Sequence, residues 1–197
     1  RHRVSFTHGV PAIAQALLSH PKAAETDFSG MTMVVGGSAL PTSLAQKALE
    51  RGIQIVTGYG MSETCPLLTL AWPTQDELAL PTDQQAALRT RTGKPFPLVR
   101  LAVVDEAMAA QPQDATSLGE VVAQSPWLTA RYAKDDKASA ALWAGGWLHT
   151  GDIGHVCPRG YLVITDRLKD VIKSGGEWIS SLQLEDLISR HPSVAEA

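Results

Sequence analysis

The segment GYGMSETCP, residues 58–66, places two glycines, an aromatic ring, a hydroxyl and a carboxylate one residue after the apolar run IQIV at 53–56. Glycine lets backbone amides approach a ligand closely, and the ring of Tyr59 offers a flat face to a planar heterocycle such as a purine. The Ser62 hydroxyl can bond a phosphate or carboxylate oxygen, and Glu63 supplies the hard oxygen that a phosphate-bound Mg²⁺ prefers. The loop is a candidate nucleotide site, although glycine turns, a packed ring and a solvated carboxylate explain the same spacing equally well.

A second glycine-bearing loop precedes it in the chain. Gly36-Gly37-Ser38-Ala39 follows the β-rich run MTMVV at 31–35. Ligands of open parallel sheets lie beyond the carboxyl ends of the strands, and parallel neighbours end at the same edge. The two loops therefore predict one ligand site at one edge of a sheet.

Two charged residues further along the chain suit a nucleotide sugar. Asp152 stands between glycines in GGWLHTGDIG at 145–154, where we expect a tight turn whose carboxylate can accept both hydroxyls of a ribose. Arg167, in TDRLKDVIKSGGEWIS at 165–180, can reach sugar or phosphate oxygens, and the glycine pair of that segment can flex or line a narrow passage. An ordinary turn aspartate and a solvated basic turn are the simpler alternatives.

Composition limits the classes of partner. The 197 residues carry a formal net charge of -3 without a long run of one sign, which indicates neither nucleic acid nor an anionic membrane as a partner. No apolar run approaches the roughly 20 residues of a membrane span, so we expect a cytoplasmic protein. Cys65 and Cys157 form no C-x-x-C pair, which favours reduced thiols. The spacing of His149, Asp152, His155 and Cys157 fits no familiar metal site.

The elements that position these residues alternate in type in the first part of the chain. An amphipathic helix is predicted over residues 11–20 and a strand over 31–35. A second helix is opened by Pro41 and ended by Gly52, and IQIV at 53–56 forms the next strand. Strand, helix and strand make a βαβ unit with parallel strands and a right-handed crossover, which assigns this part to the α/β class.

The rest of the chain differs in composition and in the spacing of its apolar residues. Residues 74–97 are polar, contain several prolines and show no sustained period, as in a connector. Three short β-rich runs then follow, at 99–105, 118–125 and 160–165. With no helix of any length expected between them, they predict a small, mostly antiparallel sheet or barrel. Ser180 and Gln183 form a capping-box pattern that predicts one more helix to about His191.

Five segments, in order along the chain, carry a resemblance to a known family: GGSALP, GYGMSETCP, LGEVVAQSP, GWLHTGDIG and DRLKDVIKSGGEWISS. The sequence resembles the adenylate-forming (AMP-binding) superfamily of acyl-CoA synthetases, luciferases and peptide-synthetase adenylation domains. The resemblance implies activation of a carboxylic acid with Mg-ATP to an acyl-adenylate and pyrophosphate, and then transfer of the acyl group to a thiol, commonly that of coenzyme A. The implied cofactors and partners are Mg²⁺, ATP, coenzyme A and a small carboxylic acid.

The resemblance also implies a role for each matching residue of the first half. Ser38 and Ala39 border the adenine, and Tyr59 stacks on it. Ser62 contacts the phosphate or the activated carboxylate, and Glu63 helps to hold Mg²⁺. The implied nucleotide-binding set over the whole chain is Gly37, Ser38, Ala39, Gly58, Tyr59, Gly60, Met61, Asp152, Ile164 and Arg167.

In the second half, the resemblance places Asp152 on the ribose hydroxyls with help from Arg167, and Ile164 in the wall of the nucleotide pocket. Lys169 falls at the hinge about which the family's small C-terminal domain turns between adenylation and thioester formation. The loop that then meets the pantetheine arm contains Gly175 and Gly176. We expect the residues from both halves to converge on a single adenylate.

The implied domain organisation has three parts: the α/β portion of a large N-terminal domain over 1–90, a small distorted β-barrel over 91–167, and a hinge with the start of an α+β C-terminal domain over 168–197. The family's phosphate-binding loop lies upstream of the segment that resembles residues 4–13, and its catalytic lysine lies near its C-terminus. We therefore expect the 197-residue chain alone to be nearly inactive, because losing one preorganised charged donor costs about 3 kcal/mol or more of transition-state stabilisation.

The identity of the acid is implied by two shorter similarities. GGEWISS at 175–181 looks most like the fatty-acyl-CoA synthetases of medium to long chain length, and residues 4–13 resemble the border of an apolar acyl pocket, with Gly9 and Val10 near the substrate. The open alternatives are an aryl or short-chain acid, a carrier-protein thiol as acceptor, and a nucleotide-binding module without catalysis. Retention of Glu63 and of the hinge lysine, which a binder of AMP alone would not require, argues against the last.

Overall fold

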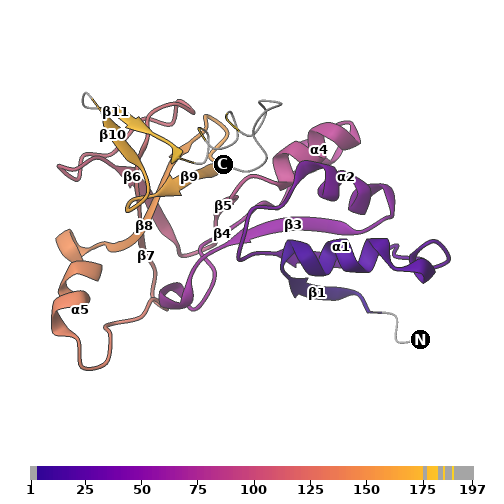
Figure 1. The fold of residues 1–197 in the computed structure, drawn as a ribbon, viewed down its shortest axis with the longest axis horizontal. Helices are drawn as coiled ribbons and strands as arrows, with labels where there is room; N and C mark the ends of the chain where they lie inside the picture. The colour runs from indigo at the N-terminus through magenta and orange to yellow at the C-terminus, as the bar shows by residue number, and fades with distance from the viewer. Residues whose placement is uncertain (1–3, 175–176, 182–183, 185–187, 189–197) are drawn as a thin grey trace. The chain divides into compact units, whose positions relative to one another are not determined.

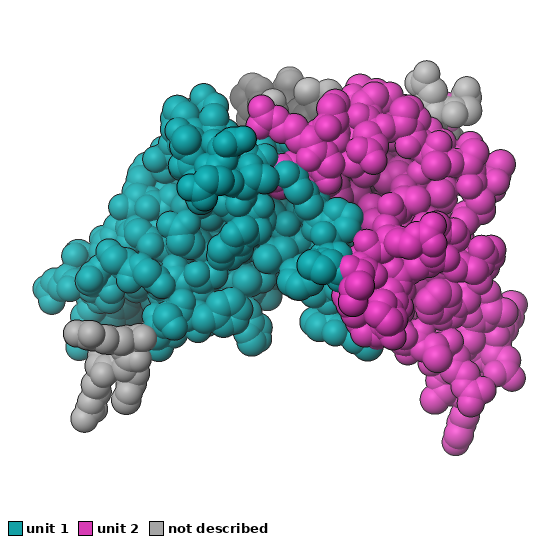
Figure 2. All heavy atoms as spheres, turned by 180° about the vertical axis from the view of Figure 1, so that it is seen from behind, with its two compact units in different colours: residues 1–97 teal, residues 98–197 magenta. Residues whose placement is uncertain are grey.

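The computed structural model describes residues 4–174, 177–181, 184 and 188. The chain divides into two compact units, residues 1–97 and residues 98–197, which Figure 2 colours separately. Each unit has its own sheet.

The first unit is built on a five-stranded sheet in the order β1-β2-β3-β4-β5 (Figure 1). The first three strands are parallel and the last two are antiparallel to their neighbours. Their bounds are β1 (Phe6–Gly9), β2 (Thr32–Val35), β3 (Gln54–Tyr59), β4 (Thr69–Leu70) and β5 (Lys94–Pro95). Parallel strands need a crossover between them, and the helices of this unit supply it.

Four α-helices and two 3₁₀ turns complete the first unit: α1 (Pro11–Ser19), η1 (Pro21–Ala23), α2 (Thr42–Glu50), η2 (Ser62–Thr64), α3 (Gln75–Leu78) and α4 (Thr82–Arg89). Helix α2 buries Leu44, Ala45 and Ala48, which recur at the spacing of one helical face, and contacts α1, α4 and β3. These side chains share one apolar core with Met33 and Ile55 of the sheet. In β2 the buried residues alternate with half-buried ones, so one face of this strand lies in the core.

The predicted βαβ unit is confirmed, because β2 and β3 pair in parallel with α2 between them. The interpretation of residues 74–97 as a structureless connector is wrong, because they contain α3, α4 and β5. Helix α3 begins with a capping box in which Thr74 and Glu77 bond each other's backbone amides. Both helices are too short for their apolar residues to show a period along the sequence.

The second unit holds a four-stranded antiparallel sheet in the order β6-β7-β8-β9 and a separate hairpin of β10 and β11. Its elements are β6 (Arg100–Val104), β7 (Gly119–Gln124), α5 (Asp136–Leu142), η3 (Ala144–Gly146), β8 (Leu148–Val156), β9 (Leu162–Arg167), β10 (Ile172–Ser174) and β11 (Glu177–Ile179). The antiparallel arrangement was predicted from the β-rich runs. Among the strands that the structure describes, no pairing joins β9 to β6, so the sheet is not a closed barrel.

Two features of the second unit differ from prediction. Helix α5 interrupts the β runs, and its N-cap Asp135 accepts a hydrogen bond from the backbone N–H of Ala138 at 2.9 Å. The glycine-rich segment around Asp152 is the long strand β8 and not a tight turn. The predicted helix to about His191 lies mostly outside the described residues. Within the described ranges, no helix is both long and apolar enough to cross a membrane.

Candidate nucleotide site

The loops after β2 and β3 lie next to each other at the carboxyl edge of the parallel strands, as predicted. The Gly36 backbone N–H donates to Gly9 O at 3.0 Å, and a Cβ added at Gly36 would stand 3.0 Å from Gly58 O. Glycine at position 36 thus permits the close approach of the first loop to the end of β3. The next three residues, Gly37, Ser38 and Ala39, are exposed at this edge.

Strand β3 extends beyond the predicted IQIV run and carries Tyr59 as its last residue. Gly58 pairs with Leu70 and Tyr59 with Thr69 across the antiparallel ladder to β4. The Leu68 backbone N–H donates to Tyr59 O at 2.8 Å. The aromatic ring therefore stands on a hydrogen-bonded strand end and is half-buried, which limits its freedom before any ligand binds.

The loop from Gly60 to Pro66 is folded tightly by its own residues. A Cβ at Gly60 would fall 1.7 Å from Pro66 O and 2.9 Å from Thr64 Oγ1, so no other residue fits this backbone path. The buried Thr64 hydroxyl accepts from the Met61 N–H at 2.9 Å and lies 2.7 Å from Pro66 O, to which it can donate. Cys65 adopts a left-handed conformation with φ 53°. These contacts set the short η2 turn that holds the acidic residue of the loop.

Within this loop, Ser62 is exposed and Glu63 is half-buried. Sequence reasoning identified both, but it missed Thr64, whose hydroxyl ties the two ends of the loop together. The role of this threonine depends on the unusual backbone angles of its neighbours, which are known only from the structure. The loop thus separates residues that shape it from residues that can meet a ligand.

In the second unit, Asp152 of β8 and Arg167 of β9 are direct cross-strand partners. Arg167 Nε lies 3.2 Å from Asp152 Oδ1, and the aspartate side chain is 9% exposed while the arginine side chain is 66% exposed. The pair therefore combines a fixed carboxylate with a cation that can move toward solvent or a ligand. Sequence reasoning named both residues, and the structure brings them together.

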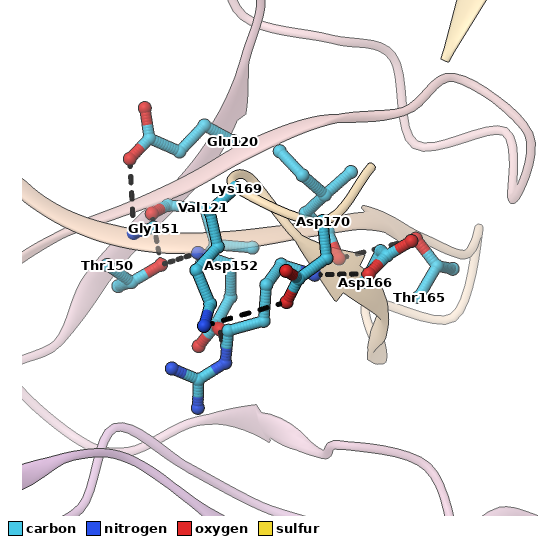
Figure 3. Close-up of polar contacts among 11 residues, drawn as sticks. Glu120, Val121, Thr150, Gly151, Asp152, Thr165, Asp166, Lys169 and Asp170 are labelled. Atoms are coloured by element: carbon cyan, nitrogen blue, oxygen red, sulfur yellow. Dashed lines mark hydrogen bonds and ion pairs between the residues drawn. The ribbon is translucent and has the colours of Figure 1, made fainter. Parts of the chain in front are cut away.

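The backbone around Asp152 is held by side chains of β7 and β8 (Figure 3). Glu120 Oε1 accepts from the Gly151 backbone N–H at 3.1 Å, and the Thr150 hydroxyl donates to Val121 O at 2.7 Å. Sequence reasoning missed Glu120 and Thr150 because their partners come from another strand. The setting of Asp152 is therefore a product of strand pairing.

The remaining predicted residues lie near the end of β9. Ile164 is a half-buried residue of that strand. Lys169 follows in a turn where Asp170 N–H donates to Arg167 O at 3.0 Å, and the Lys169 ammonium lies 3.9 Å from Asp170 Oδ2. The Lys169 side chain is 76% exposed. Gly175 and Gly176 lie outside the described residues.

Histidine, cysteine and carboxylate side chains are the usual protein ligands of metal ions. Across the parts of the chain that the structure describes, no group of three or more such side chains is placed to hold a metal ion. His149 instead contacts Glu120 Oε2 through Nδ1 at 2.9 Å and Ala144 O through Nε2 at 3.1 Å. Cys65 is exposed, Cys157 is buried, and neither forms a disulfide.

Comparison with known proteins identifies relatives along the whole chain. Residues 1–133 match the family described as AMP-binding enzyme. The chain is 41% identical to the long-chain-fatty-acid–CoA ligase of Thermus thermophilus over 98% of the chain and 36% of that protein. It is 37% identical to the 3-methylmercaptopropionyl-CoA ligase of Ruegeria pomeroyi over 100% of the chain and 36% of that protein.

The fold agrees with these matches. The structure of O-succinylbenzoate coenzyme A synthetase from Bacillus subtilis, in complex with ATP and magnesium ion, superposes with a TM-score of 0.76 at 27% identity over 100% of this chain and 38% of that one. The chain spans about a third of the length of the curated relatives it matches. Because the family match covers more than half of the residues, the chain belongs to the AMP-binding enzyme family.

Proposed function

We propose that this chain is part of an acid–CoA ligase that activates a fatty acid with Mg-ATP and transfers the acyl group to coenzyme A. The observation that carries the proposal is that different residues shape the loop after β3 and face a ligand there. Gly60 and Thr64 fold the loop, while Ser62 remains exposed and Tyr59 and Glu63 remain half-buried. A loop shaped in this way presents a ring, a hydroxyl and a carboxylate to a ligand at a parallel-sheet edge.

In the first unit, we assign the adenine to the Tyr59 ring, with Ser38 and Ala39 of the neighbouring loop at its border. Stacking on an aromatic ring holds a base through its π-face. Ser62 donates a hydrogen bond to the α-phosphate or the carboxylate of the acid. Gly37, Gly58, Gly60 and Met61 supply the backbone that brings these groups close.

A magnesium ion fits this loop by its donor chemistry. Mg²⁺ is usually held by one or two carboxylates together with substrate phosphates and water, and not by an all-protein cage. Glu63 offers one carboxylate in a half-buried position. When bound, the ion would neutralise charge on the phosphate oxygens, and Glu63 would hold it on the loop.

In the second unit, we assign the ribose hydroxyls to Asp152, with Ile164 beside the nucleotide. A carboxylate that accepts two hydroxyl protons makes strong charge-assisted hydrogen bonds. Arg167, which already contacts this carboxylate, prevents its charge from being isolated when the sugar binds. Its exposed guanidinium can also reach a phosphate oxygen.

The reaction has two steps. First, an oxygen of the acid's carboxylate bonds to the α-phosphorus of ATP, and the bond to the leaving pyrophosphate breaks. Then the coenzyme A sulfur bonds to the carbonyl carbon, the bond to AMP breaks, and the thiol proton passes to solvent. The exposed turn at Lys169 is a suitable hinge between the steps, because a few backbone torsions can absorb the change. We assign Gly175 and Gly176 to the pantetheine arm by the family resemblance alone.

AMP binding tests the nucleotide assignment. Asp152→Asn removes the charged acceptor and should raise the AMP Kd by roughly 10- to 100-fold, since one hydrogen bond to a charged group contributes about 1.5–3 kcal/mol. Asp136→Asn, at an exposed position of the same unit, is the charge-matched control and should bind AMP as the wild type does. Isothermal titration calorimetry of AMP measures both. Absence of AMP binding by the wild type, or equal Kd values for the two variants, would refute the assignment.

The acid is tested separately. The relatives named above act on different acids by their names, so a pyrophosphate-release screen of the whole ligase, of which we propose this chain is a part, should use saturated acids of increasing chain length, benzoate and 3-methylmercaptopropionate. The proposal expects the largest kcat/KM for medium- to long-chain fatty acids. A maximum with a short or aromatic acid would contradict the assignment of the acid while leaving the reaction class intact.

A further inference from the structure

Next to Asp152, strand β8 has two more residues between its paired positions than its partner β7, which makes a bulge. The side chains of Thr150 and Glu120 form hydrogen bonds to the backbone at this bulge. We propose that Thr150 and Glu120 are positioning residues that hold the Asp152 carboxylate for the nucleotide. The inference rests on the proposed role of Asp152 in ribose binding. It concerns residues that do not themselves touch the nucleotide.

The irregularity is defined by the register of the two strands. Glu120 pairs with Ile153, and Val122 pairs with His149, so Val121 alone stands opposite the three residues 150–152. An insertion of this kind leaves ladder groups without their usual partners and bends the strand. The unpaired backbone groups must find other partners, because buried N–H and C=O groups are nearly always bonded.

The Thr150 hydroxyl provides two of these partners. It donates to Val121 O at 2.7 Å and accepts from the Asp152 backbone N–H at 3.1 Å (Figure 3). Thr150 is 6% exposed, so water does not readily replace it. One side chain therefore links the facing strand to the backbone nitrogen of the residue that carries the functional carboxylate.

Glu120 braces the same irregularity from β7. Its Oε1 accepts from the Gly151 N–H at 3.1 Å, and its Oε2 contacts His149 Nδ1 at 2.9 Å. Gly151 has φ +68°, and a Cβ added there would meet nothing within 4 Å, so glycine is favoured by the backbone angle and not by space. The carboxylate of Glu120 thus fixes both flanks of the bulged residue Thr150.

The hydrogen bonds of Thr150 and Glu120 affect the placement of Asp152 relative to Arg167. Directly after the bulge, Asp152 pairs with Arg167, and Gly151 O accepts from the Leu168 N–H at 2.8 Å. If the bulge relaxes, the carboxylate shifts relative to the guanidinium and to the segment that follows β9. Hydrogen bonds to two ribose hydroxyls depend on that placement.

A pair of matched substitutions separates positioning from general stability. Thr150→Val removes the hydroxyl without changing the shape of the side chain. Thr165→Val is the control on the other side of β8, since its hydroxyl donates at 3.3 Å to Ile153 O, one residue after Asp152. We expect the AMP Kd to rise about tenfold for Thr150→Val and to stay within about twofold of wild type for Thr165→Val. Thr150→Ser retains the hydroxyl and should restore binding.

A second pair tests Glu120 in the same way. Glu120→Gln keeps an oxygen that can accept from the Gly151 N–H, and Glu120→Ala does not. AMP binding should weaken more for the alanine variant than for the glutamine variant, at matched thermal stability. Equal Kd values for Thr150→Val and Thr165→Val, or for the two Glu120 variants, would overturn the inference.

Amide hydrogen exchange distinguishes failure of this inference from failure of the proposed function. In Thr150→Val the Asp152 amide should exchange at least about tenfold faster than in the wild type, because its acceptor is gone, whereas Thr165→Val should leave it unchanged. If the wild type binds no AMP, the ribose role and the inference both fail, whatever the exchange rates. If the wild type binds AMP and the Asp152 amide exchanges at the same rate in both variants, only the positioning role of Thr150 and Glu120 is refuted.

Discussion

Gly60 is the position where the structure makes the sharpest prediction. In Gly60→Ala the new Cβ would stand 1.7 Å from Pro66 O and 2.7 Å from Pro66 C, whereas real Cβ contacts essentially never fall under 3.0 Å. The backbone at Pro66 must therefore retreat by about 1.3 Å, because a packed loop has no void to absorb the methyl group. This movement pulls Pro66 O away from the Thr64 hydroxyl and disturbs the contact of that hydroxyl with Met61.

The cost follows from the contacts that are lost. The Thr64 hydroxyl contacts and the Thr64 N–H bond to Met61 O, at 3.0 Å, contribute about 1 kcal/mol each, so the variant should lose roughly 2–3 kcal/mol of unfolding free energy. The larger effect concerns the ligand. If the ring of Tyr59 no longer faces the base, about 1–3 kcal/mol of stacking disappears, which raises the AMP Kd roughly 5- to 150-fold.

Gly30→Ala is the matched control for backbone strain. Gly30 has φ +79° and nothing within 4 Å of an added Cβ, so alanine there costs only the left-handed conformation, about 1–2 kcal/mol. Both variants should be measured by urea unfolding and by calorimetric titration of AMP. We expect both to be destabilised, but only Gly60→Ala to lose AMP binding. Wild-type AMP affinity in Gly60→Ala would refute the view that this loop holds the base.

Two further predictions concern the second unit. The N–H groups of Ser117 and Thr116 and the hydroxyl of Ser117 lower the pKa of Asp114 well below its ordinary value of 3.8. A lowered folded-state pKa contributes stability above pH 3.8 that is lost as the pH falls further, so the Tm difference between wild type and Asp114→Ala should be constant from pH 7 to 5 and shrink below pH 3.8. A constant difference down to pH 2.5 in circular dichroism melts would contradict this. Asp166, 3% exposed, accepts from the Arg167 N–H at 2.7 Å and the Ser181 N–H at 2.5 Å, so Asp166→Ala should cost about 2 kcal/mol or more in urea unfolding. Asp170→Ala, which removes an exposed ion pair, should cost under about 0.5 kcal/mol, and equal losses would count against the Asp166 contacts.

The first unit was well predicted where local signals agree. An apolar run closed by glycine marked strand β2, and the apolar run at 53–56 marked β3. Pro41 and Gly52 bounded the helix between them. The short pieces between residues 74 and 97 were missed, because a helix of four to eight residues has too few apolar positions to show a period. The capping box of Thr74 and Glu77 is a local signal for the start of α3 that the prediction did not use.

The candidate site was predicted unevenly for a related reason. Residue types suggested the chemistry of Tyr59, Glu63, Asp152 and Arg167, and the pairing of the last two is observed. The roles in nucleotide binding stay predictions. The setting of Asp152 was predicted wrongly as a turn, because its bulge exists only in the register between β7 and β8.

The sequence by itself determined which chemical groups are available and which loops follow which strands, because glycine, proline and apolar runs act through near neighbours in the chain. The tertiary structure decided how those groups are held. Thr64 closing its loop, Glu120 and Thr150 bracing β8, and the contact of Arg167 with Asp152 all join residues through packing or strand register. Such partners are chosen by the free energy of the whole folded unit, which no short segment contains.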